Sequence, residues 1–242
     1  MQTQAGLVNT RLNELRAWAV HAYTSLGLVL GFMALVAIVE GRKHELVLLL
    51  ALAGFVDSTD GPLARWSKVS RWVPQFDGRK LDDIVDYLNY ALLPVFACYR
   101  FGLVPAPWTP VLFLVLLAAA YGFCQQAAKT DDKYFTGFPN YWNVLAFYMY
   151  LLRLPPTANA LILLVFALMV FIPVKYISSQ TQPFRWLTMS VSAIWGTMIL
   201  NILATWDQPN LAVVYGSLFG PAYYVGISLY LNYFWPRARQ LR

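Results

Sequence analysis

Charged side chains are scarce in this sequence of 242 residues. Asp, Glu, Lys and Arg make up 12% of it, against about 25% in soluble domains, while hydrophobic residues make up 59% and the mean hydropathy is +0.50. Cysteine occurs only as Cys98 and Cys124. Both lie in apolar stretches, which favours buried thiols over a disulfide or a metal pair. The composition indicates a membrane protein.

Three further features that the sequence lacks narrow the class of membrane protein. The apolar runs lack the alternating pattern of an outer-membrane barrel. The polar start lacks a small-residue cleavage site, so it is not typical of a cleaved signal peptide. No linker, low-complexity tract or internal repeat divides the chain. We therefore expect a single integral membrane domain over residues 1–242.

Long apolar runs predict an all-α, polytopic membrane helical bundle. A helix needs about 20 residues to cross ~30 Å of hydrocarbon, and eight runs reach or approach that length. We expect about eight transmembrane helices, at residues 18–39, 45–66, 80–101, 109–128, 139–152, 158–178, 185–205 and 211–234. Residues 6–17 place Leu7, Val8, Leu12 and Leu15 on one side, which predicts either an N-terminal interfacial helix or a frayed tail.

The positive charges indicate an orientation. With eight spans and a cytoplasmic N-terminus, fourteen of the eighteen Lys and Arg residues fall inside, which is a strong bias. The residues predicted inside are Arg11, Arg16, Arg65, Lys68, Arg71, Arg79, Lys80, Lys129, Lys133, Lys175, Arg185, Arg237, Arg239 and Arg242. Both termini are then cytoplasmic, and topology together with anionic lipid explains the net charge of +6 without nucleic acid.

Residues 55–90 contain six of the twelve acidic residues. Asp57 and Asp60 lie three apart near the cytoplasmic end of the second span, and Asp82 and Asp86 lie four apart near the start of the third. These spacings place each pair on one helical face, and a short loop makes the two helices antiparallel neighbours. Four converging carboxylates need compensation, and all-oxygen ligands favour Mg²⁺, Mn²⁺ or Ca²⁺. Ordinary loop acids paired with Arg65, Arg79 and Lys80 are the alternative.

Small residues accompany the aspartates. Gly61, Ala64 and Gly78 remove bulk where a ligand or a neighbouring helix must come close. Arg65 is well shaped for phosphate oxygens, and Pro62 predicts an interruption of the second span. Together these residues suggest a phosphate-bearing ligand held by metal ions.

The order Asp57-x2-Asp60-Gly61-x2-Ala64-Arg65, then Gly78-x3-Asp82-x3-Asp86, resembles the signature of the CDP-alcohol phosphotransferase family. All eight signature positions are present. The gap between Arg65 and Gly78, "WSKVSRWVPQFD", is longer than in most members and resembles the bacterial phosphatidylcholine synthase branch. The opening "RAWAVHAYTSLG", the length and the eight apparent spans resemble the same branch.

The resemblance implies a function and roles for residues. It implies transfer of a phosphatidyl group from CDP-diacylglycerol to choline in a bacterial inner membrane, giving phosphatidylcholine and CMP; serine, glycerol 3-phosphate or inositol are alternative acceptors. It further implies a cytoplasmic active site and a homodimer. The implied ligands of one or two Mn²⁺ or Mg²⁺ ions are Asp57, Asp60, Asp82 and Asp86, with Asp86 as general base. The implied nucleotide and phosphate contacts are Gly61, Ala64, Arg65 and Gly78.

Choline as acceptor predicts a binding site lined by aromatic residues. A quaternary ammonium favours aromatic faces, and aromatic residues make up 16% of the chain. The candidates for choline binding are Tyr90, Tyr87, Tyr23, Tyr121 and Trp142, each of which is also typical of interfacial or packing aromatics.

Two other classes compete with this interpretation. The string "DDIVD" at residues 82–86 also fits an Asp-rich box of membrane prenyltransferases, but only Asp131, Asp132 and Asp207 follow it, in no matching pattern. A cation transporter is the second alternative, although residues 122–242 hold no counterpart of the aspartates to form a repeated half.

Overall fold

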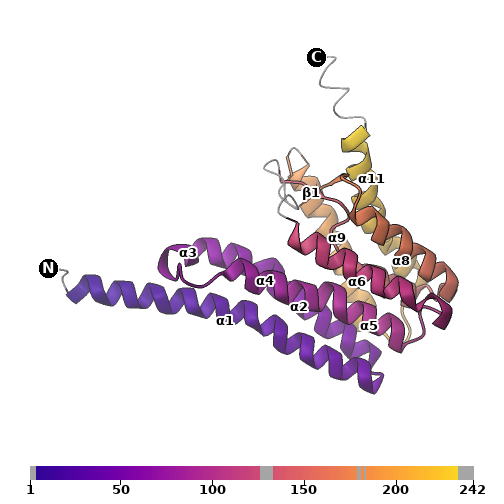
Figure 1. The fold of residues 1–242 in the computed structure, drawn as a ribbon, viewed down its shortest axis with the longest axis horizontal. Coiled ribbons are helices and arrows are strands. Elements are labelled where there is room, and N and C mark those ends of the chain that lie inside the picture. Colours follow the sequence, from indigo (N-terminus) through magenta and orange to yellow (C-terminus); the bar gives the residue numbers. More distant parts are fainter. Residues whose placement is uncertain (1–3, 126–132, 179–180, 183, 234–242) are drawn as a thin grey trace, which may run out of the picture. The chain divides into compact units, whose positions relative to one another are not determined.

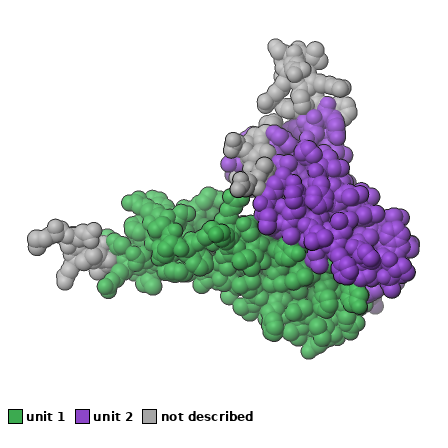
Figure 2. Space-filling view, in the orientation of Figure 1, with its two compact units in different colours: residues 1–100 green, residues 101–242 purple. Residues whose placement is uncertain are grey.

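A computed structural model describes residues 4–125, 133–178, 181–182 and 184–233 (Figure 1). The chain divides into two compact units, residues 1–100 and 101–242, which Figure 2 shows in different colours. The charges predicted inside at Lys129, Arg237, Arg239 and Arg242 lie outside the described residues, as do Asp131 and Asp132 and the side chains of Leu7 and Val8.

Unit 1 is built on a helical hairpin. Its two long helices are joined by a turn in which Gly41 has a φ of +77° and the Arg42 N–H donates to the Ala37 carbonyl at 2.8 Å. In Figure 1 the remaining helices of the unit run beside this hairpin. The elements are α1 (Gln4–Glu40), α2 (Lys43–Trp66), α3 (Val69–Trp72), α4 (Gly78–Asp86), η1 (Tyr87–Leu92) and α5 (Leu93–Arg100).

The prediction of a separate interfacial helix at residues 6–17 is wrong. Helix α1 runs unbroken from Gln4 to Glu40, because no proline interrupts its hydrogen bonds and the stretch around Ala17 and Ala19 favours continued helix. The interruption predicted at Pro62 is also absent, since α2 continues through it to Trp66.

The predicted third span corresponds to three consecutive helical segments, α4, η1 and α5, from Gly78 to Arg100. The middle segment, η1, is π-helical. Such segments are rare and often occur at functional sites, and this one begins directly after Asp86.

Unit 2 is also helical, with one small sheet. Strands β1 (Phe135–Thr136) and β2 (Lys175–Tyr176) pair antiparallel, with Phe135 opposite Tyr176. Buried Phe138, Trp142 and Tyr176 contribute aromatic packing to its core. The helices are η2 (Ala106–Trp108), α6 (Thr109–Cys124), α7 (Trp142–Leu151), α8 (Pro156–Val170), α9 (Arg185–Ala204), α10 (Leu211–Ser217) and α11 (Phe219–Tyr233).

Large apolar side chains on the surface indicate a bilayer environment. Phe32, Leu117 and Leu200 are 65%, 68% and 64% exposed, which is unfavourable in water and favourable in lipid. Among the described residues, five segments are long and apolar enough to cross a membrane: Asn9–Glu40, Lys43–Trp66, Ala106–Cys124, Arg185–Ala204 and Leu211–Tyr233.

The membrane-helical fold class is confirmed, whereas the count of eight spans stays a prediction. Helices α7 and α8 have only 10 and 15 residues, fewer than the about 20 needed to span. Of the two cysteines, both free, Cys98 is buried as expected, but Cys124 is exposed because it ends α6.

Candidate active site

Helices α2 and α4 bring three of the predicted aspartates together. Asp57, Asp82 and Asp86 each offer a carboxylate oxygen, and these oxygens all lie within 4.8 Å of one another. Asp82 and Asp86 lie on one face of α4 because they are four residues apart, and Asp57 faces them from α2. We call these three residues the aspartate triad. Its formation confirms that the two carboxylate-bearing faces converge.

No described basic side chain forms an ion pair with the triad, although the positive charge of Arg79 acts on Asp82 over a longer distance. Ion pairs within the described part of the chain join Arg42 to Glu40 and Glu45, and Lys80 to Asp77. The alternative in which the aspartates pair with Arg65, Arg79 and Lys80 is therefore not supported. Three carboxylates at this separation repel one another strongly unless a cation or protons compensate.

The atoms of the triad fit a divalent cation. The Asp86 Oδ1 is buried without a hydrogen-bond partner among the described residues, so this oxygen is available to a cation. One Asp57 oxygen, Oδ2, accepts a hydrogen bond from the Tyr90 hydroxyl at 2.8 Å, which orients that carboxylate. Hard oxygen ligands of this kind suit Mg²⁺, Mn²⁺ or Ca²⁺.

Asp60 is not a member of the triad, although its charge acts on Asp82 and Asp86. It is 7% exposed and sits one turn further along α2, but its oxygens are not among the mutually close ones. The Thr24 side chain of α1 lies next to it, and the Thr24 hydroxyl donates to the Val20 carbonyl at 3.4 Å. The prediction that Asp60 is a metal ligand therefore stays a prediction, and Thr24 is a contact that the sequence interpretation did not assign to it.

The predicted nucleotide contacts differ in their surroundings. Gly61 is open, since an added Cβ would meet only Arg65 Nη1, at 3.4 Å, and Arg65 itself is exposed. Ala64 packs against an apolar cluster formed by α1 and α3. At Gly78 the missing side chain is replaced by a protein group, because an added Cβ would lie 2.7 Å from His21 Cε1.

Three of the proposed choline-binding aromatics belong to unit 1. Tyr90 bonds to Asp57, and the Tyr23 hydroxyl lies 2.7 Å from Thr59 Oγ1, next to Asp60 in sequence. Tyr87 directly follows Asp86 and is half-buried. Tyr90 is therefore the candidate most directly connected with the triad.

The other two aromatics belong to unit 2. Trp142 is 1% exposed, donates to Asn140 Oδ1 at 3.1 Å and packs against Phe138, which is typical of a core residue. Tyr121 is exposed and contacts Phe171. Their assignment to choline stays a prediction.

Sequence interpretation did not single out Asn89. This residue of η1 is 3% exposed, and its Nδ2 donates to the Gly27 carbonyl of α1 and to the Val85 carbonyl, both at 3.0 Å. An asparagine in the apolar run that follows Asp86 was the available signal, because polar residues within membrane helices are rare and usually have a role.

Comparisons with known proteins agree with the signature. A family model described as CDP-alcohol phosphatidyltransferase matches residues 20–173. The phosphatidylcholine synthase of Pseudomonas aeruginosa is 36% identical over 235 residues, covering 96% of each chain. Those of Legionella pneumophila and Rhizobium johnstonii are 35% and 32% identical, over 90% and 91% of this chain and 88% and 92% of their own.

The matched segment includes the aspartate triad and every other position of the signature. With relatives above 30% identity over nearly the whole length, the chain belongs to the CDP-alcohol phosphatidyltransferase family.

Proposed function

We propose that the protein transfers the phosphatidyl group of CDP-diacylglycerol to choline, forming phosphatidylcholine and releasing CMP. The observation that carries the proposal is the aspartate triad, assembled from the family signature in a chain similar to phosphatidylcholine synthases along its length. The same chemistry with serine, glycerol 3-phosphate or inositol as acceptor is the alternative.

Asp57, Asp82 and Asp86 would hold a divalent cation, either Mn²⁺ or Mg²⁺, and Asp60 would join them if a second ion binds. When bound, the cation neutralises charge on the diphosphate of the donor and on the leaving phosphate. Arg65, exposed beside Gly61, supplies guanidinium donors to the nucleotide phosphates.

Asp86 is the residue best placed to take a proton. Its buried Oδ1 has no partner among the described residues and can accept the proton of the acceptor hydroxyl. The hydroxyl oxygen then forms a bond to the phosphorus next to diacylglycerol, and the bond from that phosphorus to the bridging oxygen breaks. CMP leaves with the electron pair, so the charges and atoms balance.

The wider setting is part of the proposal. We infer that the active site and both termini face the cytoplasm of a bacterial inner membrane, on the basis of the positive charges. We also infer one catalytic domain, because the matched residues 20–173 continue from unit 1 into unit 2. A homodimer follows from the family resemblance alone.

The acceptor is tested directly. Purified protein in lipid, with CDP-diacylglycerol and Mn²⁺ or Mg²⁺, is expected to release CMP and form phosphatidylcholine with choline only. Separate reactions contain serine, glycerol 3-phosphate or inositol, and mass spectrometry identifies the lipid. Turnover with another alcohol would replace choline as acceptor, whereas no CMP from folded protein with any alcohol would reject the family chemistry for this chain.

Replacing Asp82 with Asn should abolish metal-dependent transfer while the protein stays folded, because one charged ligand of the triad is lost. We expect a decrease in kcat on the order of a hundredfold or more and weaker Mn²⁺ binding, measured by electron paramagnetic resonance. Asp83→Asn, one residue away and outside the triad, is the matched control and should retain both properties. Unchanged Mn²⁺ binding in Asp82→Asn would reject the metal assignment.

Tyr90→Phe separates two roles of Tyr90: the hydrogen bond that orients Asp57 and the predicted contact with choline. The variant keeps the aromatic ring but loses the 2.8 Å hydrogen bond to Asp57, so Mn²⁺ affinity should fall about tenfold while the KM for choline stays constant. Tyr99→Phe, at an exposed tyrosine of α5, is the control. A raised choline KM with normal Mn²⁺ affinity would instead place the hydroxyl in the acceptor site.

A further inference from the structure

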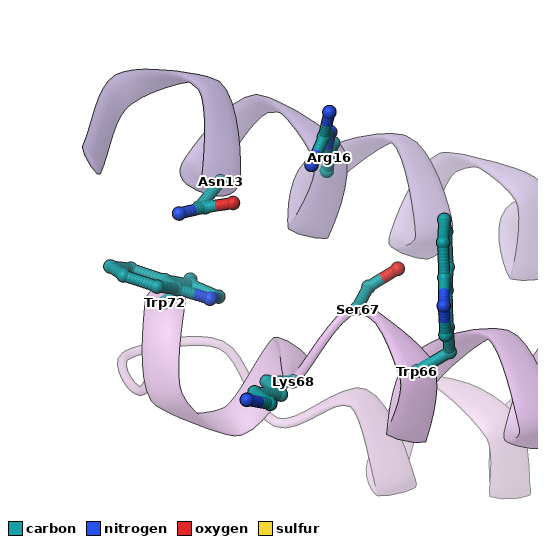
Figure 3. Close-up of a pocket in the computed structure, with 6 residues that line it drawn as sticks. All are labelled: Asn13, Arg16, Trp66, Ser67, Lys68 and Trp72. Carbon is teal, nitrogen blue, oxygen red and sulfur yellow. The ribbon is translucent and has the colours of Figure 1, made fainter. Parts of the chain in front are cut away.

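A pocket of about 300 Å³ lies between α1 and the end of α2, away from the aspartate triad. Figure 3 shows side chains from α1, from the end of α2, from the connection after it and from α3 around this space. Two carry positive charge and two are tryptophans, and none of the described lining residues is acidic. The lining residues are Asn13, Arg16, Trp66, Ser67, Lys68 and Trp72.

The one pocket residue that belongs to α2, Trp66, lies on the other side of that helix from Asp57. Trp66 follows Asp57 by nine residues, which is about two and a half turns and therefore half a rotation around the helix. An apolar cluster of Ala17, Val20, Val69 and Val73 packs against Trp72 and against Ala64. The pocket is thus a separate site with its own apolar backing.

The residues that line the pocket lie at the predicted interface between the hydrocarbon core and the lipid headgroups. Arg16 is the last charged residue before the apolar run of α1, and Trp66 is the last residue of α2. Tryptophan and the charged ends of Arg and Lys prefer the headgroup layer. Arg16 and Lys68 lie at opposite edges of the pocket, with Asn13 and Ser67 between them (Figure 3), so an anionic headgroup in the pocket would have a cation on either side.

The backbone at Lys68 provides an independent observation. Lys68 has φ 51° and ψ 45°, in the left-handed region, where a side chain costs about 1–2 kcal/mol relative to glycine. Glycine would form the turn between α2 and α3 more easily. The lysine side chain is therefore present at some cost to stability, which is typical of a residue with a binding role.

We propose that this pocket binds the phosphate of an anionic membrane lipid. The choice of an anionic over a zwitterionic lipid follows from the charges, because the ammonium of a zwitterionic headgroup would be repelled by Arg16 and Lys68. The tryptophan rings pack against the lipid's glycerol and the first carbons of its chains. Basic pockets beside membrane helices bind lipid headgroups in this manner.

The test compares lipid retention by native mass spectrometry. Purified protein in mild detergent receives equal amounts of phosphatidylglycerol and phosphatidylethanolamine with identical chains. Wild type should retain phosphatidylglycerol preferentially, and Arg16→Gln/Lys68→Gln should lose this preference by about fivefold per cation. The control Arg42→Gln/Arg185→Gln removes the same charge outside the pocket and should keep the preference.

A single variant, Lys68→Gly, makes the test independent of folding. It should raise the melting temperature, because the backbone strain is removed, and at the same time weaken phosphatidylglycerol retention about fivefold. Equal loss in the control would show nonspecific charge attraction and overturn the proposal. Displacement of the lipid by millimolar inorganic phosphate would assign the pocket to a soluble phosphate, which also overturns it.

A second inference concerns the contact between α1 and the helix that carries Asp82 and Asp86. Gly27 and Gly31 allow this contact, since a Cβ at Gly31 would lie 2.7 Å from Leu88 and one at Gly27 would overlap Val85. Asn89 stabilises this contact between the helices, because its amide donates to the Gly27 carbonyl of α1 and to the Val85 carbonyl of α4. The π-helical η1 that contains Asn89 also carries Tyr90 to Asp57.

We infer that Asn89 is a positioning residue for the aspartate triad. Its hydrogen bond to α1 fixes the rotation and height of α4 and η1, and thereby the distance from Asp82 and Asp86 to Asp57. The inference rests on the proposed metal site. Without the amide, the Gly27 carbonyl loses a buried donor and the π-helical turn loses its attachment to α1.

Asn89→Leu is compared with Asn159→Leu. Asn159 of unit 2 is a matched control, since it is fully buried, donates to the Leu103 carbonyl at 2.8 Å and, like Asn89, leaves its Oδ1 unpaired. Both variants should melt at lower temperature, but only Asn89→Leu should bind Mn²⁺ about tenfold more weakly. Choline KM should not change in either variant.

Normal Mn²⁺ affinity in Asn89→Leu, or equal weakening in Asn159→Leu, would overturn the positioning role. If Asn89→Leu does not insert, Asn89→Ser retains one donor and should show a smaller loss of Mn²⁺ affinity. Failure of the proposed metal site is distinguished from failure of this inference, because in that case Asp82→Asn also leaves Mn²⁺ binding unchanged.

Discussion

Mutual repulsion among Asp57, Asp82 and Asp86 is the constraint on which unit 1 depends. Their oxygens lie within 4.8 Å of one another, in a chain where isolated carboxylates are unfavourable. Such a cluster persists only if surrounding contacts hold its helices and if cations or protons compensate the charge. The contacts at Asn89 and Tyr90 supply the first condition, since they connect η1 with α1 and with α2. The second condition, compensation of the negative charge, would be met by a divalent cation bound to the carboxylate oxygens.

Helix α1 contributes no carboxylate to the triad, yet it contacts the site at three levels. His21 fills the space left by Gly78, Thr24 contacts Asp60, and Gly27 receives the Asn89 amide. These residues are spaced by three, so they follow one side of the helix. A continuous α1 is therefore useful, because an unbroken helix keeps the three contacts in fixed register, which a hinge near residue 17 would not.

Sequence spacing predicted the convergence of the aspartates, because helical periodicity fixes which side chains share a face. It did not predict which three of the four aspartates have oxygens within 4.8 Å of one another, since a rotation of α2 by a fraction of a turn decides this and only packing sets the rotation. It also could not assign Gly78 to His21 or Asn89 to Gly27, as these partners are 57 and 62 residues apart. Hydropathy alone could not fix the number of spans, for a related reason. The run at 80–101 includes a π-helical segment, and the short α7 has no hydropathy signal that separates a span from a buried helix.

The arrangement of charge around α2 links the triad and the lipid pocket. Arg16 of α1 and Lys68, which follows α2, line the pocket with Trp66, and they form no described ion pair with the triad. If both sets of charge faced one side, the cations would neutralise the carboxylates and weaken their affinity for a metal. Separation of the two sets leaves the carboxylates available for a cation and the basic side chains available for phosphate. Helix α2 then contributes Asp57 to the metal site and Trp66 to the lipid pocket. Both contributions depend on the rotation of α2 about its axis, and the packing of α1 along α2 fixes that rotation.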